Sequence, residues 1–192
     1  LCEGLKAIIL SNYGVFDKFT GDGVLAFFPN FHSGKDAGQL ALKTAFEAHQ
    51  FFDAHYRKNR NCFSTILRDV GLGIGIDYGE ANLVRITSFT VVGHPVVYAC
   101  RLSSANPGET LINQPAYEDI QSKYPGMFNI EETSLNIKTD GNIVVYKATS
   151  NGSELKPMIP AWAAEQQAEE QSEEKQADPP SGDAGQSQTP QA

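Results

Sequence analysis

The stretch Val15–Pro29, VFDKFTGDGVLAFFP, sets a Gly-Asp-Gly segment between two runs of large apolar residues. Two apolar runs joined by a glycine-containing turn predict a β-hairpin with strands at about Val15–Thr20 and Val24–Phe28, because tight hairpin turns need a positive φ angle. Asp22, in the middle of the turn, is open to two interpretations. It is either a plain turn residue or a carboxylate that also has a chemical role.

Apolar residues at helical spacing predict helices around this hairpin. The first spans about Leu1–Ser11, with Gly14 in the place of a C-terminal cap. The longest spans about Lys35–Arg60, and the basic residues at its end suit the helix dipole. Pro95 suits the first turn of a third helix, and a fourth is expected near Pro115–Lys123.

The segment Val70–Ile86, VGLGIGIDYGEANLVRI, predicts two strands joined around Gly79. Glycine occupies every second position at the start of the first strand, which leaves one face bare and lets another backbone approach closely. Strands alternating with helices, together with antiparallel hairpins, indicate an α+β fold with helices on one face of a sheet. Four more strands are expected at about Phe89–Val92, Thr110–Ile112, Leu135–Ile137 and Ile143–Ala148.

Composition divides the chain into two parts. With 192 residues, 41% of them hydrophobic, the chain can bury the core of one α/β domain, which we place at residues 1–150. Residues 151–192 hold eight acidic and two basic residues, a net −6 of the −8 carried by the whole chain. Because this acidic Pro/Gln/Glu-rich tail has few large apolar side chains, we expect it to be disordered from about Glu165 onward.

Composition also excludes several classes of partner. The chain has no basic patch for nucleic acid and no apolar run near the ~20 residues of a membrane span, so neither is expected to bind this segment. Cys2, Cys62 and Cys100 are widely spaced and lack a CxxC motif, which favours a reducing, cytoplasmic location over a disulfide or zinc framework. The sequence starts without Met inside a predicted helix, so we expect a piece of a larger or membrane-anchored protein.

Three motifs in a fixed order carry a resemblance to a known family. FDKFTGDGVLAFF, GLGIGIDYGEA and FTVVGHPVVYACRLSSANPGETLIN together resemble the catalytic domain of the class III adenylate and guanylate cyclases, over about Leu1–Ala148. The resemblance implies a ferredoxin-like or polymerase palm-type antiparallel sheet with helices packed on it. It also implies a head-to-tail dimer with two Mg²⁺ or Mn²⁺ ions per site, which converts a nucleoside triphosphate into a 3′,5′-cyclic monophosphate and pyrophosphate.

The resemblance assigns a role to each of five residues. Asp22 matches a metal-binding carboxylate, Lys18 the lysine that binds the purine edge, and Thr90 its common companion in adenylate cyclases. Arg101 matches the arginine that stabilises charge on the α-phosphate, and Lys138 resembles the lysine that meets the terminal phosphates. In the family pattern, Lys18 and Thr90 together favour ATP over GTP as substrate. For each residue the alternative is an ordinary role on a strand, a turn or the surface.

The sequence also departs from the family pattern. Val97 stands four residues before Arg101, where the family has an asparagine that orients the ribose, and His94 and Asp77 occupy positions where other residues are common. The resemblance places the second metal carboxylate on a strand upstream of the first helix, a ligand segment absent from this chain.

Two hypotheses follow. The first is an active adenylate cyclase domain in intracellular signal transduction, working as a homodimer or with a cyclase-like partner domain. Its dimer interface is expected to bury the glycine-rich strand and the segment Pro95–Arg101. The second is a catalytically impaired cyclase-homology domain that binds nucleotide or dimerises as a regulatory module. The motif residues favour the first hypothesis, and Val97 favours the second.

Overall fold

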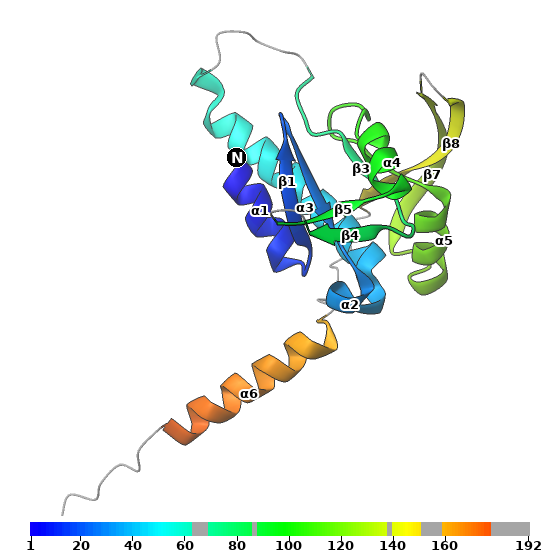
Figure 1. The fold of residues 1–192 in the computed structure, drawn as a ribbon. Helices are drawn as coiled ribbons and strands as arrows, with labels where there is room; N and C mark the ends of the chain where they lie inside the picture. Colours follow the sequence, from blue (N-terminus) through cyan, green and yellow to red (C-terminus); the bar gives the residue numbers. More distant parts are fainter. Residues whose placement is uncertain (63–68, 86–87, 138–139, 151–158, 178–192) are drawn as a thin grey trace, which may run out of the picture. The chain divides into compact units, whose positions relative to one another are not determined.

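The computed structural model describes residues 1–62, 69–85, 88–137, 140–150 and 159–177 (Figure 1). The chain divides into two compact units, Leu1–Met158 and Ile159–Ala192, and each is described by itself. The helices of the first unit are α1 (Cys2–Ser11), α2 (Asn30–Ser33), α3 (Ala37–Lys58), α4 (His94–Leu102) and α5 (Gln114–Lys123), with 3-10 turns η1 (Gly34–Asp36) and η2 (Arg60–Cys62). Its strands are β1 (Val15–Thr20), β2 (Gly23–Phe27), β3 (Ile74–Ile76), β4 (Asn82–Arg85), β5 (Phe89–Val92), β6 (Thr110–Ile112), β7 (Phe128–Ile137) and β8 (Gly141–Ser150).

The expected hairpin is confirmed as β1 and β2, which pair antiparallel with Thr20 opposite Gly23. The two residues between them are Gly21, whose φ is 71°, and Asp22. A positive φ at the first of two central residues is the conformation that glycine adopts without steric cost. The pairing skips one residue between Phe16 and Lys18, so Asp17 forms a β-bulge in the middle of β1.

The end of α1 corrects one detail of the sequence analysis. Gly14 does not take the left-handed position; Tyr13 does, with φ 57°. The amide of Gly14 donates to the carbonyl of Ile9, and the amide of Tyr13 donates to that of Leu10, which is the Schellman arrangement with glycine one position further along. A Cβ at residue 14 would lie 2.6 Å from the ring of Phe28, so packing, and not φ, requires glycine there.

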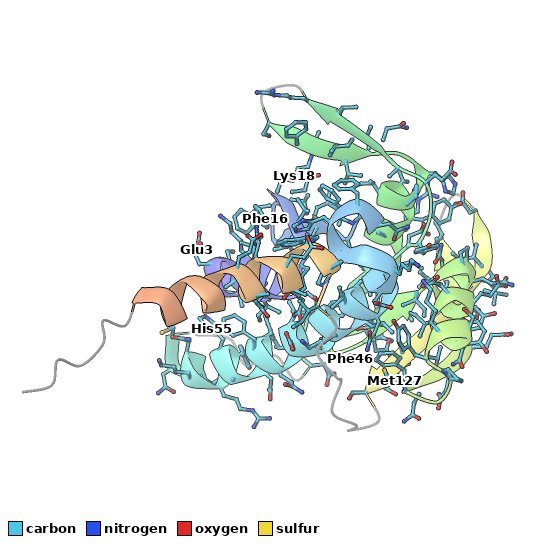
Figure 2. The ribbon with its side chains drawn as sticks, turned by 90° about the horizontal axis from the view of Figure 1, so that it is seen from below. Glu3, Phe16, Lys18, Phe46, His55 and Met127 are labelled. Carbon is cyan, nitrogen blue, oxygen red and sulfur yellow. The ribbon has the colours of Figure 1, made fainter. Side chains whose placement is uncertain are left out.

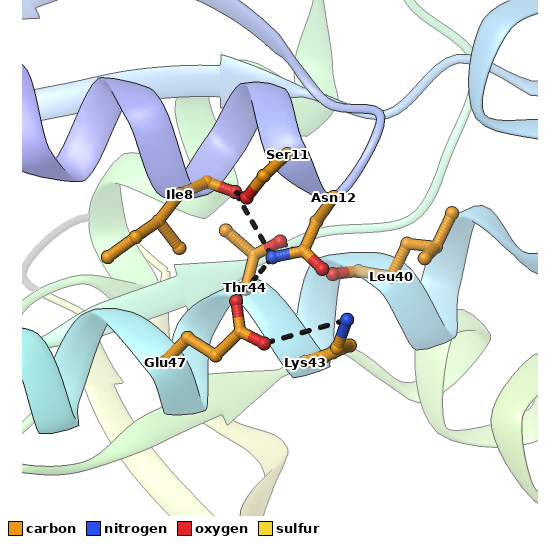
Figure 3. Close-up of polar contacts among 7 residues, drawn as sticks. All are labelled: Ile8, Ser11, Asn12, Leu40, Lys43, Thr44 and Glu47. Atoms are coloured by element: carbon orange, nitrogen blue, oxygen red, sulfur yellow. Dashed lines mark hydrogen bonds and ion pairs between the residues drawn. The ribbon is translucent and has the colours of Figure 1, made fainter. Parts of the chain in front are cut away.

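A buried polar contact joins α1 to α3 (Figure 3). Asn12, which is 2% exposed, donates to the carbonyl of Ile8 at 3.1 Å and to a carboxylate oxygen of Glu47 at 2.6 Å. Lys43 lies 3.5 Å from the other Glu47 oxygen. Because the buried amide is paired in this way, the end of α1 is fixed on α3, beside the start of the hairpin.

The main sheet has the strand order β3-β6-β8-β7. β3 runs parallel to β6, while the other pairs are antiparallel, so the expected α+β class is confirmed with a mixed sheet. Helices cover both faces, which corrects the expectation of a single covered face. Consecutive residues of a strand point to opposite faces, so the two core clusters lie on opposite sides of the sheet. One contains Leu42, Ile112, Ala116, Ile120, Tyr124, Phe128, Tyr146 and Ala148, from α3, α5 and their strands. The other contains Leu102, Leu111 and Val145, from the end of α4 and its strands.

The alternating glycines make room for α4 on this second face. A Cβ at Gly73 would lie 2.5 Å from the carbonyl oxygens of both Ser103 and Ala105. A Cβ at Gly75 would overlap the carbonyl of Ala99. The bare face of the strand therefore receives the backbone at the end of α4, as the sequence analysis expects. The same finding corrects one part of the expected dimer interface, because α4 covers the glycine-rich strand within the chain; the part at Pro95–Arg101 stays a prediction.

The second unit contains α6 (Ala161–Ala177). This helix occupies part of the tail that the sequence analysis expects to be disordered. Its Ala, Glu and Gln residues have high helix propensity, which accounts for a helix without a continuous apolar face. The proposed boundary between a domain at 1–150 and a tail at 151–192 stays a prediction.

Gly73→Ala is expected to lower the free energy of unfolding by about 1–3 kcal/mol, because the added methyl group meets backbone that must shift. Urea denaturation followed by circular dichroism measures the change. The control is Val144→Ala on β8, where the side chain is 56% exposed and the change should stay within about 0.5 kcal/mol. Equal stability of Gly73→Ala and the wild type would contradict the proposed packing of α4 on the glycine face.

Candidate active site

Lys18 and Thr90 lie in direct contact although they are distant in sequence. The Lys18 ammonium donates to the Thr90 hydroxyl at 2.7 Å, which joins β1 to β5. Figure 2 labels Lys18 on β1, two residues after Phe16, whose ring lies 5.4 Å from the ammonium of Lys6. The side chain of Lys18 is 47% exposed, so its remaining N–H groups are open to a ligand. The structure thus brings together the two residues that the resemblance pairs at the purine.

A buried carboxylate lies beneath this pair. The side chain of Asp17 is 2% exposed, and one of its oxygens accepts hydrogen bonds from the Thr90 hydroxyl at 2.8 Å and from the Val91 amide at 3.0 Å. Its other oxygen lies 3.8 Å from the Lys18 ammonium. In a regular strand, Asp17 and Lys18 would point to opposite faces, and the bulge at Asp17 lets both reach Thr90.

Asp22 lies at the tip of the hairpin and is exposed. A carboxylate there is open to water and to a cation, and it supplies one hard oxygen ligand of the kind that Mg²⁺ prefers. Among the described residues, no group of three or more His, Cys, Asp or Glu side chains is placed to hold a metal ion. Asp22 therefore fits as one ligand, and the described part of the chain does not complete a two-metal site.

Arg101 and Val97 lie on α4, a different element from the strands β1 and β5 that carry Lys18 and Thr90. Val97 is 49% exposed, so an asparagine in its place would meet solvent and would not disturb an apolar interior. Arg101 forms an ion pair with Asp140, which also accepts a hydrogen bond from the Tyr98 hydroxyl at 2.6 Å. A phosphate that used Arg101 would have to compete with this carboxylate. Lys138 lies outside the described residues.

A second polar cluster lies beside α4. A cavity of about 460 Å³ is lined by Asp77, His94, Tyr98 and Asn113, among others. Burial raises the pKa of Asp77 to about 6, and the charge of His94 and a hydrogen bond from Asn113 oppose this shift. The ring of His94 stacks on that of Tyr98 with centroids 4.3 Å apart. The cavity therefore extends along α4 from His94 at its start to Tyr98, which donates to Asp140.

An apolar groove of about 670 Å³ separates β2 from β3. Residues of α3, including Ala41, Thr44 and Ala45, line it together with Phe27 of β2 and Ile76 of β3. β2 pairs with β1 and β3 pairs with β6, so in the described residues each strand has an edge without a strand partner. The groove is thus bordered by two open strand edges.

Comparisons with known proteins identify the fold. No protein-family model and no curated protein matches the sequence, but solved structures do. The adenylyl cyclase CyaB from P. aeruginosa has a TM-score of 0.67 at 20% identity, covering 82% of this chain and 81% of that chain. The guanylyl cyclase Cya2 has a TM-score of 0.66 at 19% identity, covering 82% and 80%.

A third structure is the guanylate cyclase domain of RhGC from Catenaria anguillulae in complex with GTP. It has a TM-score of 0.57 at 18% identity, covering 78% of this chain and 79% of that chain. The chain therefore has the fold of the adenylate and guanylate cyclase catalytic domains, and the resemblance carried by its three motifs is confirmed at the level of the fold. Both substrate classes occur among these structures.

Sequence reasoning missed two carboxylates of the site. Asp17 lies within the first motif but was given no role, although an acid beside a lysine in an otherwise apolar strand is a signal of a paired carboxylate. Asp140 lies two residues after Lys138, between two expected strands, and nothing in the sequence shows that this segment meets α4. In the described residues, no helix is long and apolar enough to cross a membrane.

The raised pKa of Asp77 predicts a pH dependence of stability. Since the folded pKa of about 6 exceeds the ordinary aspartate pKa of 3.8, the folded state binds more protons between these pH values, and stability falls as pH rises through this window. Asp77→Asn should therefore stabilise the domain at pH 7 relative to the wild type, by on the order of 1 kcal/mol for a half-buried group, and should do so less at pH 4. Urea unfolding at both pH values measures this, with the exposed Asp69→Asn as control. An equal effect of Asp77→Asn at pH 4 and pH 7 would contradict the raised pKa.

Proposed function

We propose that the Leu1–Met158 unit is the catalytic domain of a nucleotide cyclase that forms 3′,5′-cyclic AMP and pyrophosphate from ATP. The observation that carries the proposal is the 2.7 Å contact between Lys18 and Thr90, which places two purine-binding candidates side by side on different hairpins. The fold shared with solved adenylyl and guanylyl cyclases supports a nucleotide cyclase. The residue types of the pair support adenine as the base.

The proposed reaction needs charge stabilisation more than covalent chemistry from the protein. The 3′-hydroxyl of the substrate gives its proton to water and attacks the α-phosphorus, a new O–P bond forms, and the bond to the pyrophosphate, which leaves, breaks. Bound Mg²⁺ or Mn²⁺ ions would supply Lewis-acid polarisation of the hydroxyl and the phosphates. Asp22 would hold metal, and Arg101 would stabilise the charge on the α-phosphate with its planar, permanently charged guanidinium. Lys138 is proposed to meet the terminal phosphates.

A dimer is part of the proposal. Lys18 and Arg101 lie in separate clusters, and Arg101 is paired with Asp140 in this chain. We propose that two subunits, or this chain and a cyclase-like partner, face each other so that one supplies the purine and metal groups and the other supplies Arg101. Exposed apolar side chains support such an interface: Phe19, Leu83, Phe89, Val92 and Val97.

The groove between β2 and β3 supports a place for the second metal carboxylate. A strand between the two open edges would lie over α3, bury its apolar face in the groove and continue the hydrogen bonding of both neighbours. We propose that an extended segment of the complete protein occupies the groove and carries that carboxylate.

The second candidate function is a regulatory module that binds nucleotide without turnover. Two observations favour it: Val97 replaces the ribose-orienting asparagine, and Asp140 already neutralises Arg101. Cyclic nucleotide formation by the complete protein with ATP and Mn²⁺ separates the two candidates, because a regulatory module would bind ATP and release no product.

Asp22→Asn in the complete protein should abolish Mg²⁺- or Mn²⁺-dependent cyclic AMP formation, because it removes the charge of a ligand. The exposed position of residue 22 means that the fold should not change, and thermal unfolding checks this. The control is Asp53→Asn on α3, an exposed acid paired with Arg57, which should leave turnover unchanged. Normal turnover of Asp22→Asn would return Asp22 to the role of a plain turn residue.

Val97→Asn should raise the rate of cyclic AMP formation with little change in nucleotide affinity, provided that only the ribose contact has been lost. A single orienting contact that acts in the transition state is worth about 10²- to 10³-fold in rate. Because Val97 is 49% exposed, the substitution should leave stability nearly unchanged. Initial rates with ATP and Mn²⁺ measure the effect. An unchanged or lower rate would show that other groups, such as Tyr98 or His94, orient the ribose.

A further inference from the structure

We infer that Asp17 is a specificity-determining residue that acts through Thr90: it fixes the direction of the Thr90 hydroxyl so that the site accepts a hydrogen bond from adenine and rejects guanine. This inference rests on the proposed function, since it concerns the base that Lys18 and Thr90 would bind. It requires no contact between Asp17 and the nucleotide. Asp17 is thus a positioning residue.

Asp17 is a buried carboxylate. Its side chain is 2% exposed, so its oxygens must find partners inside the protein. They find three, the Thr90 hydroxyl at 2.8 Å, the Val91 amide at 3.0 Å and the Lys18 ammonium at 3.8 Å. The β-bulge at Asp17 makes this arrangement possible, because it turns an acid toward β5 next to a lysine that also faces β5.

The Thr90 hydroxyl is held between a donor and an acceptor. A hydroxyl has one proton to donate and two lone pairs to accept with. The Lys18 ammonium can only donate, and an ionised carboxylate can only accept. Thr90 lies between them at 2.7 and 2.8 Å, so its proton must point to Asp17 and one lone pair must receive Lys18. What remains for a ligand is one lone pair on Thr90 and the free N–H groups of Lys18.

The free lone pair of Thr90 and the free N–H groups of Lys18 match adenine better than guanine. Adenine presents an amino group and the acceptor N1 along its Watson–Crick edge. The amino group can donate to the free lone pair of Thr90, and N1 can accept from Lys18. Guanine presents the acceptor O6 where adenine has its amino group, so it would set one acceptor against another. Without Asp17, the Thr90 hydroxyl could turn and donate to O6, and the discrimination would weaken.

The test compares ATP and GTP with four versions of the complete protein: wild type, Asp17→Ala, Thr90→Val and the double variant. Initial rates give kcat/KM for each nucleotide, and competition against a fluorescent ATP derivative gives the two dissociation constants. Asp17→Ala is expected to lower the preference for ATP over GTP about tenfold, the equivalent of roughly one hydrogen bond. In the Thr90→Val background, Asp17→Ala should change the preference no further, because the hydroxyl through which it acts is gone.

Two controls separate this role from a structural one. Thr90→Ser keeps the hydroxyl and should keep the preference, whereas a general loss of stability would lower both nucleotides together. Asp53→Asn, an exposed acid on α3, should leave the preference unchanged. If Asp17→Ala does not fold, Asp17→Asn takes its place. Its amide can accept from Val91 and donate to Thr90, so the hydroxyl is no longer held in one direction and the preference should fall.

The outcomes distinguish the inference from the proposed function. An active wild type whose ATP preference is the same in the Asp17 variants overturns the inference and leaves the cyclase intact. A second outcome is that neither nucleotide gives product, but the wild type binds ATP in preference to GTP and Asp17→Ala loses this preference. That outcome overturns the cyclase and supports the inference. Binding of neither nucleotide overturns both.

Discussion

The site depends on one buried carboxylate. The side chain of Asp17 is almost fully buried, although it lies on one strand of a two-stranded hairpin. A charge buried there without partners would cost several kcal/mol. Its hydrogen bonds to Thr90 and Val91 tie the β1–β2 hairpin to the β4–β5 hairpin. Lys18 also contacts Thr90. The residues that join the two hairpins therefore include the two that form the candidate purine site.

Local sequence signals were sufficient for most of the elements. The hairpin around Gly21, the long helix α3 and the strand β6 follow from apolar spacing and turn residues, which act over a few neighbours. The placement of helices on both faces of the sheet did not follow, because it depends on α4 returning to the bare side of β3 after the β4–β5 hairpin. The alternating glycines signalled a close backbone approach, but not which backbone would make it.

The candidate site was predictable in the same uneven way. Lys18 and Thr90 were paired from motif positions, and the structure places them in contact. Asp17 and Asp140 were missed because their importance comes from partners far away in the sequence, which spacing does not reveal. The bulge that turns Asp17 inward depends on the pairing of β1 with β2. Strict alternation along β1 would have placed Asp17 and Lys18 on opposite faces of the strand.

In the proposed reaction two clusters would have separate roles: Lys18 and Thr90 would select the base, and Arg101 would stabilise charge on the phosphate. We propose that the Lys18–Thr90 pair selects adenine in a domain that catalyses cyclisation. The most direct measurement is mass spectrometry of the products formed by the complete wild-type protein from equal concentrations of ATP and GTP with Mn²⁺. We expect mainly 3′,5′-cyclic AMP. Mainly cyclic GMP, or no cyclic nucleotide at all, would contradict it.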